Sequence, residues 1–188
     1  GEQLIEIQHG SLSAIRQKVK CLLPDHRVTV VKPIIQRKRI IKQKSRSGPV
    51  VSQRWSPKRG APLNLFDDLV YFTSVFPHPN LILETPLVEI EELRYPGHGR
   101  RRRWRRNDFE VEDQRLVEIG PSYRYEQATD LFQLVPRRLP RVFHTGHLAD
   151  RLGVERWIAQ RVAYCMRETG ATVQVGKEGN ARLYQRAA

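Results

Sequence analysis

Glycines divide the last quarter of the chain into short segments, and this division most constrains what the chain can fold into. Gly153 separates an apolar-periodic stretch at 147–152 from a longer one at 155–169, and Gly170 follows the longer stretch. Glycine is common in the turn between two helices, and it is also the usual residue where a helix ends in the left-handed conformation. The pattern predicts two helices joined by a tight turn.

A β-hairpin is expected after the second helix. Thr172–Val175 and Arg182–Gln185 have strand-like composition, and Gly176–Asn180 between them supplies a glycine-containing tip. Before the first helix, Thr145 is expected to act as the N-cap, and Ala128–Leu134 predicts a further short helix.

This order of helices and hairpin resembles a winged helix-turn-helix domain, which we expect at residues 123–188. The resemblance implies that the second helix of the turn enters the major groove of DNA while the hairpin contacts the backbone. It implies these contact residues: Arg156, Gln160 and Arg161 on the helix, with Lys177 and Arg182 on the wing. Winged helices also serve as protein-interaction modules, so a protein partner stays open.

The net charge of +13 comes mainly from the first 59 residues, which hold 14 Lys or Arg and 3 Asp or Glu. Such a surplus favours a polyanionic partner, and we expect nucleic acid, DNA rather than RNA. A basic hairpin is expected at Arg37–Lys44 and Pro49–Trp55. The cations expected to bind phosphates here are Arg37, Lys38, Arg39, Lys42, Lys44, Arg54, Lys58 and Arg59.

The run at 100–106 contains six arginines and has two interpretations. In one, Arg101, Arg103 and Arg105 contact phosphates. In the other, the run is a strand whose arginines form cross-strand ion pairs with the acids at 89–92. Alternate side chains of a strand point to opposite faces, so the six arginines cannot all face one ligand.

The beginning of the chain predicts a strand, a helix and a second strand. Gln3–Gln8 and Arg27–Ile35 are largely apolar, and a helix starting near Ser11 is expected to reach Leu23. Two such strands joined by a helix favour a parallel pair with a crossover connection.

A helix followed by β structure is expected in the middle of the chain. Leu63–Val75 predicts the helix, and an antiparallel β region is expected from Leu81–Tyr95, Arg101–Arg106 and Glu110–Ile119. The expected fold class is therefore α+β. It combines an N-terminal strand–helix–strand module with its basic hairpin, a central antiparallel β region and a C-terminal winged helix. Residues 1–122 would form the first domain.

The tripeptide Glu6-Ile7-Gln8 ends the first expected strand. Residues 3–35 resemble the second half of the PD-(D/E)XK nuclease core, in which a strand with Glu-x-Lys or Glu-x-Gln precedes a helix and another strand. The resemblance implies that Glu6 binds Mg²⁺, Gln8 positions the attacking water and Lys18 replaces the family's lysine. The metal-binding Asp of the family would lie before residue 1, so this chain would be a truncated, inactive part of such an enzyme.

Two cysteines, Cys21 and Cys165, are too few for a disulfide framework, and both are expected to be reduced core residues. No apolar run has the length of a membrane span. We therefore expect a cytoplasmic DNA-binding protein. A metal-dependent nuclease and an RNA-associated or protein-interaction adaptor are the alternatives, and a homo-oligomer stays open.

Overall fold

The computed structural model describes residues 3–97, 108–135 and 138–187. The chain divides into two compact units. Unit 1 contains Gly1–Pro33, Pro62–Thr85 and Tyr123–Ala188, whereas unit 2 contains Ile34–Ala61 and Pro86–Ser122. The expected boundary at residue 122 coincides with one junction between the units, and the independence of residues 123–188 as a domain stays a prediction.

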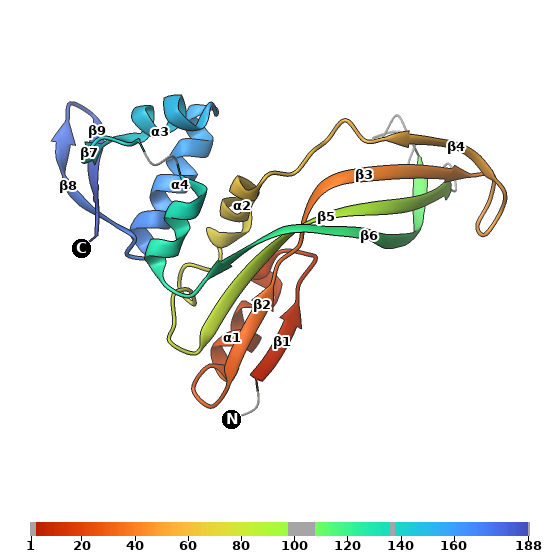
Figure 1. Cartoon of the computed structure of the whole chain (residues 1–188), viewed down its shortest axis with the longest axis horizontal. Coiled ribbons are helices and arrows are strands. Elements are labelled where there is room, and N and C mark those ends of the chain that lie inside the picture. The colour runs from red at the N-terminus through yellow and green to blue at the C-terminus, as the bar shows by residue number, and fades with distance from the viewer. Residues whose placement is uncertain (1–2, 98–107, 136–137, 188) are drawn as a thin grey trace. The chain divides into compact units, whose positions relative to one another are not determined.

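The elements follow one another along the chain as labelled in Figure 1. The strands are β1 (Gln3–Ile7), β2 (Arg27–Val31), β3 (Ile34–Gln43), β4 (Val50–Trp55), β5 (Leu81–Pro96), β6 (Phe109–Tyr125), β7 (Val142–Phe143), β8 (Thr172–Glu178) and β9 (Ala181–Arg186). The α-helices are α1 (Arg16–Leu22), α2 (Leu65–Leu69), α3 (Thr145–Leu152) and α4 (Arg156–Glu168). Short 3-10 helices occur at Leu12–Ala14 (η1), Pro62–Asn64 (η2) and Ala128–Leu134 (η3).

The described strands form a six-stranded mixed sheet and a three-stranded antiparallel sheet, so the fold is α+β. The larger sheet has the order β1-β2-β5-β3-β4, and β6 also pairs with β5. β1 and β2 are parallel and joined through α1, which confirms the expected crossover. β3 and β4 are antiparallel, which confirms the expected hairpin.

The structure corrects two expectations for the β structure. The strand expected at Arg27–Ile35 is interrupted at Lys32 and Pro33, because proline has no N–H to donate to a ladder. The central region is not a separate antiparallel sheet, since β5 pairs parallel with β2 and then with β3. The expected strand at Arg101–Arg106 lies outside the described residues.

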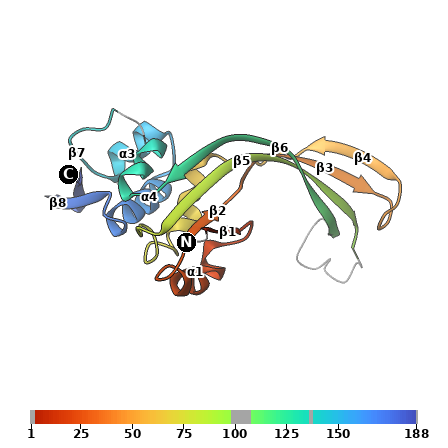
Figure 2. The same cartoon turned by 60° about the horizontal axis from the view of Figure 1, so that its bottom comes forward.

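Apolar side chains from distant segments form the core of unit 1. α1 lies beside β1 and β2 in Figures 1 and 2, and it buries Val19 completely. Only Leu65–Leu69 of the helix expected at 63–75 is α-helical, yet the apolar side chains of Phe72 and Phe76 beyond it are also buried. Turns therefore place the remaining apolar side chains in the core as effectively as a longer helix would.

The C-terminal segment of unit 1 forms the two expected helices and the expected hairpin. Gly153 and Gly170 both have positive φ, 64° and 81°, at the ends of α3 and α4. The strand order in the small sheet is β7-β9-β8. The expected cap Thr145 is instead the first residue of α3. His144 is the N-cap, because its side chain accepts hydrogen bonds from the backbone N–H of Gly146 and His147.

Burial separates the two cysteines. Cys165 lies in the core as expected, and burial raises the pKa of its thiol to about 12. Cys21 is exposed, which contradicts the expectation. Val19 forms the buried face of α1, and Cys21, two positions later, points to a different side of the helix. None of the helices in the described part of the chain has the length and apolar character needed to cross a membrane.

Candidate nucleic-acid interface

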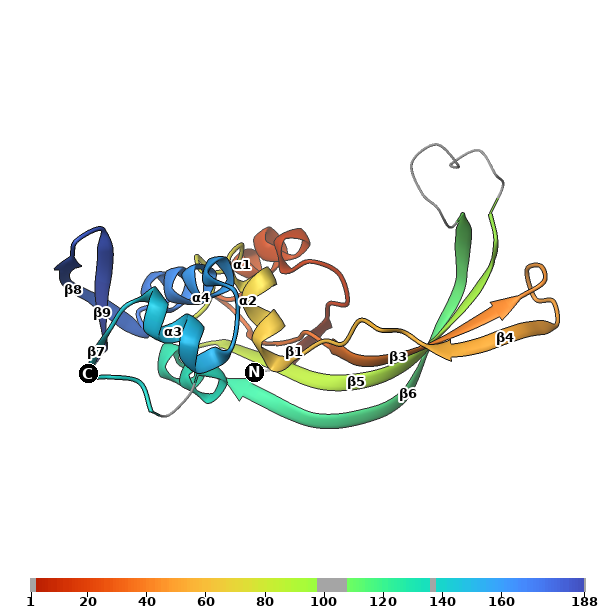
Figure 3. The same cartoon turned by 90° about the horizontal axis from the view of Figure 1, so that it is seen from above.

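α4 lies beside the β8–β9 hairpin in unit 1 (Figure 3). A basic groove is lined by residues of α4 and of this hairpin. We call it the C-terminal groove; its cavity volume is about 360 Å³. Its lining residues are Thr145, Arg156, Gln160, Tyr164, Arg167, Asn180, Ala181, Arg182 and Tyr184.

The spacing of side chains on α4 explains why this face of the helix is polar. Arg156, Gln160 and Tyr164 are four residues apart, and residues with this spacing share one face of a helix. The opposite face buries Val162 and Met166 completely. α4 is therefore held by its apolar face and presents its basic face to the groove.

The groove is positively charged. Arg167 pairs with Glu168 and its guanidinium lies 5.6 Å from the centroid of the Tyr164 ring. Arg156 and Arg182 form no ion pair with any residue that the structure describes, and both are exposed. Their charges are available to an anion.

Three of the five residues expected to contact DNA come together in this groove: Arg156, Gln160 and Arg182. Arg161 does not. It pairs with Asp67 of α2 and stacks on Trp157, 5.0 Å from the ring centroid. One residue along a helix turns the side chain by about 100°, so Arg161 follows Gln160 on a different face.

The hairpin separates its two expected contact residues. Lys177 is the cross-strand partner of Arg182, but it is not part of the groove lining. The sequence interpretation missed Tyr164 and Tyr184 as lining residues. For Tyr164 the four-residue spacing from Arg156 was an available signal.

The expected phosphate contacts at the start of the basic hairpin lie in ion pairs within unit 2. Arg37 reaches Glu89 at 3.0 Å, Lys38 reaches Glu92 at 2.8 Å, and Arg39 reaches Glu91 at 3.3 Å. The parallel pairing of β3 with β5 brings these side chains together. The acids at 89–92 therefore have partners on β3. Arg101, Arg103 and Arg105 lie outside the described residues, so both interpretations of the arginine run stay predictions.

Glu92 is the most buried of these carboxylates, at 3% exposure. Burial acts to raise the pKa of the Glu92 carboxyl, but hydrogen bonds from Lys38, Gln114 and Arg94 outweigh it and lower the pKa from its ordinary value. Glu92 is therefore a charged centre that holds three side chains from three strands.

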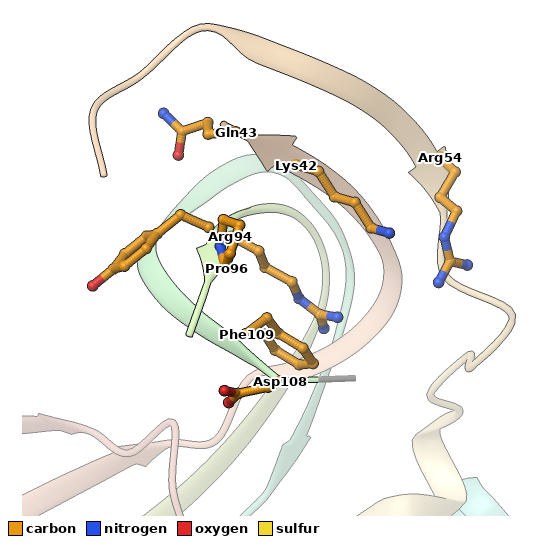
Figure 4. A pocket seen from close by; sticks show the side chains of 8 residues that line it. Lys42, Gln43, Arg54, Arg94, Pro96, Asp108 and Phe109 are labelled. Atoms are coloured by element: carbon orange, nitrogen blue, oxygen red, sulfur yellow. The ribbon is translucent and has the colours of Figure 1, made fainter. Parts of the chain in front are cut away.

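The remaining expected cations of unit 2 divide into two groups. Lys42 and Arg54 line a cavity of about 180 Å³, together with Arg94, and we call this space the unit 2 cavity (Figure 4). The other group comprises Lys44, Lys58 and Arg59, which are exposed and do not line the cavity. The ring of Trp55, at the end of β4, is covered on one face by the Arg37 guanidinium, 4.1 Å from the ring centroid.

Glu6, Gln8 and Lys18 are near one another but engaged. Lys18 Nζ lies 2.6 Å from Glu6 Oε2, and Gln8 Nε2 donates to the carbonyl of Ser11 at 2.9 Å. Among the described residues no group of three or more His, Cys, Asp or Glu side chains could hold a metal ion. Lys18 thus neutralises Glu6, and the nuclease role of these residues stays a prediction.

Comparisons with known proteins identify a family. The model of the family described as "Domain of unknown function (DUF8091)" matches residues 1–126, so the chain belongs to this family. An uncharacterized protein of Treponema pallidum (strain Nichols) is 26% identical over 184 residues, which cover 97% of this chain and 71% of that protein. No solved structure matches the chain.

Proposed function

We propose that this member of the DUF8091 family binds duplex DNA, and that residues 123–188 are the winged helix-turn-helix domain that does so. The order of elements supports the proposal: η3, β7, α3, α4 and the β8–β9 hairpin follow one another as in that domain. The family match ends at residue 126, close to the proposed start of the domain.

The C-terminal groove is the observation that carries this proposal. It brings Arg156 and Gln160 from α4 together with Arg182 from the hairpin. An arginine can donate two hydrogen bonds to a guanine edge, and a glutamine can pair with an adenine edge. Asn180 at the hairpin tip and Arg182 would contact the backbone phosphates beside the helix.

The shape of α4 favours DNA over RNA. The major groove of B-DNA is wide enough for an α-helix, whereas the deep, narrow major groove of A-form RNA is not. A 13-residue helix with one polar face is therefore suited to duplex DNA.

The test compares two double variants that lose the same charge. R156Q/R182Q removes the two groove arginines that form no ion pair within the described part of the chain, and R141Q/R151Q removes two exposed arginines of the same segment that lie outside the groove. We expect R156Q/R182Q to weaken duplex binding about 30-fold and the control less than about threefold. Fluorescence anisotropy with a labelled mixed-sequence duplex measures both.

Two outcomes would contradict the proposal. Equal weakening by both variants would mean that only net charge matters. Unchanged binding by R156Q/R182Q would assign the groove to a protein or structural role. Circular dichroism of each variant establishes that the fold is retained.

A further inference from the structure

The unit 2 cavity gathers cations where a sheet would ordinarily avoid them. Its lining residues come from the ends of β5 and β6 and from the β3–β4 hairpin. In Figures 2 and 3 these ends of β5 and β6 turn away from the hairpin. Lys42 of β3 is the direct cross-strand partner of Arg94 of β5, and Arg54 of β4 is two residues beyond Ser52, the other partner of Lys42. Like charges directly opposite on neighbouring strands are destabilising.

We propose that this cavity binds one nucleotide of a single-stranded nucleic acid, with its phosphate held by Lys42 and Arg54. The site belongs to unit 2 and does not depend on the C-terminal groove. A nucleic acid strand and a free nucleotide share the chemistry that this site would recognise, a phosphate ester that carries a base.

The charges in the cavity favour an anion. Arg94 is fixed by Glu92, and its guanidinium lies 3.9 Å from the centroid of the Phe109 ring. Lys42 and Arg54 are exposed and form no ion pair with any described residue. The carboxylate of Asp108 also lines the cavity, so the described lining residues comprise three cations and one acid. A phosphate would remove the repulsion between Lys42 and Arg94 and accept charge-assisted hydrogen bonds.

The other end of the cavity has a feature suited to a base. Figure 4 shows the charged ends of Lys42, Arg54 and Arg94 on one side, near Phe109, and the Gln43 amide on the other. Gln43 is 8% exposed, and its Oε1 accepts no hydrogen bond from the described residues. A buried acceptor without a donor costs free energy, and an adenine or cytosine amino group is a donor that could satisfy it.

The size and position of the cavity favour a single strand over a duplex. The cavity is small, with a volume of about 180 Å³. The phosphate of one nucleotide would occupy one end of the cavity, and the base of the same nucleotide would occupy the other. A base can enter such a space only when it is not paired and stacked in a helix.

The experiment uses the R156Q/R182Q background, so that the C-terminal groove contributes little to binding. Into it we introduce K42Q/R54Q, or the matched control K58Q/R59Q, which removes two exposed cations of the same unit outside the cavity. The probe is a fluorescein-labelled hexanucleotide of deoxyadenosine. We expect K42Q/R54Q to weaken binding about tenfold and to lower the slope of log affinity against log salt by about 1. The control should weaken it less than about threefold.

Equal losses for the two variants would overturn the site, because the cations would then act only through net charge. Competition separates the ligand sources. Adenosine monophosphate that competes as well as the unlabelled hexanucleotide indicates a free nucleotide, and weaker competition indicates a nucleic acid strand. Inorganic phosphate that competes as well as adenosine monophosphate would overturn the nucleotide proposal.

The role of Gln43 is tested without changing the protein. Hexanucleotides of deoxyadenosine and deoxycytidine should bind at least about threefold tighter than deoxythymidine, because only the first two bases carry an amino group. Equal affinity for all three would overturn recognition of the base by Gln43. Duplex binding by the unmodified C-terminal groove serves as a separate measurement, so failure of this proposal and failure of the DNA-binding proposal are distinguishable.

Discussion

The basic strand β3 and the C-terminal groove both carry clustered cations, but their charges are used differently. Arg37, Lys38 and Arg39 of β3 each face a carboxylate of β5. Arg156 and Arg182 of the groove face none among the described residues. A cation that is already paired within a sheet binds a phosphate more weakly, because the phosphate must first displace the carboxylate partner. The register of strand pairing therefore decides how much of a charge surplus is available.

The largest effect is expected where the β3 pairing is most buried. Glu92→Gln removes the charge that holds Lys38 and Arg94, and we expect a loss of about 2–3 kcal/mol in the free energy of unfolding. Glu91→Gln is the matched control on the same strand. Its side-chain partner is 45% exposed, so the loss should stay below about 1 kcal/mol. Urea denaturation measures both, and equal losses would show that burial does not distinguish the two pairs.

The next effect compares the regions directly in DNA binding. R37Q/K38Q/R39Q removes three charges, yet we expect duplex affinity to fall less than about threefold, against about 30-fold for R156Q/R182Q. The charge surplus of the first 59 residues, taken alone, would favour the opposite order. Titrations by anisotropy at a fixed salt concentration decide between them. A larger loss for the β3 variant would restore the simple count of charges as the better guide.

A smaller effect is expected in the dependence of stability on pH. The pKa of Glu92 is lowered in the folded protein, so its charged interactions contribute their full stability above the ordinary pKa of a glutamate. This contribution is lost as the pH falls through the folded pKa. Glu92→Gln should therefore flatten the decline in unfolding free energy as the pH falls below the ordinary pKa of a glutamate, as followed by urea denaturation at several pH values. An unchanged decline would mean that other carboxylates cause it.

The smallest effect concerns the arginine that left the groove face. Asp67→Asn frees Arg161 from its ion pair, whose partners are 30% and 45% exposed. We expect less than about 1 kcal/mol of lost stability and less than about a twofold change in duplex affinity. Thermal unfolding and anisotropy are the measurements. A large gain in affinity would show that Arg161, once released, can reach the DNA after all.

Local patterns in the sequence were sufficient for much of the fold. The crossover from β1 to β2, the β3–β4 hairpin and the two glycine-limited helices all depend on residues close together in the chain. The hydrophobic periodicity and the turn residues within such a segment are enough to predict it. Gly153 and Gly170 show this most clearly, because each has the positive φ that a helix end requires.

The pairing of strands that are distant in the sequence could not be predicted from local patterns. Arg37 and Glu89 are 52 residues apart, and nothing local indicates that β3 selects β5 as a parallel partner. The same pairing places Lys42 opposite Arg94, and both residues line the unit 2 cavity. In the groove, the division between Gln160 and Arg161 depends on the exact rotation of α4, and an error of one residue moves a side chain to another face.

The division of the chain between the two units has a consequence for cooperativity. Unit 2 consists of two excursions, Ile34–Ala61 and Pro86–Ser122, which leave unit 1 and return to it after 28 and 37 residues. While unit 2 is unfolded, the folding of unit 1 must close two flexible loops of these lengths, and each closure costs about 3 kcal/mol of conformational entropy. When unit 2 is already folded, these segments have lost their chain entropy, and closing each loop costs less. The two units should therefore favour one another's folding through chain connectivity itself, and mutations that melt unit 2 should lower the melting temperature of unit 1.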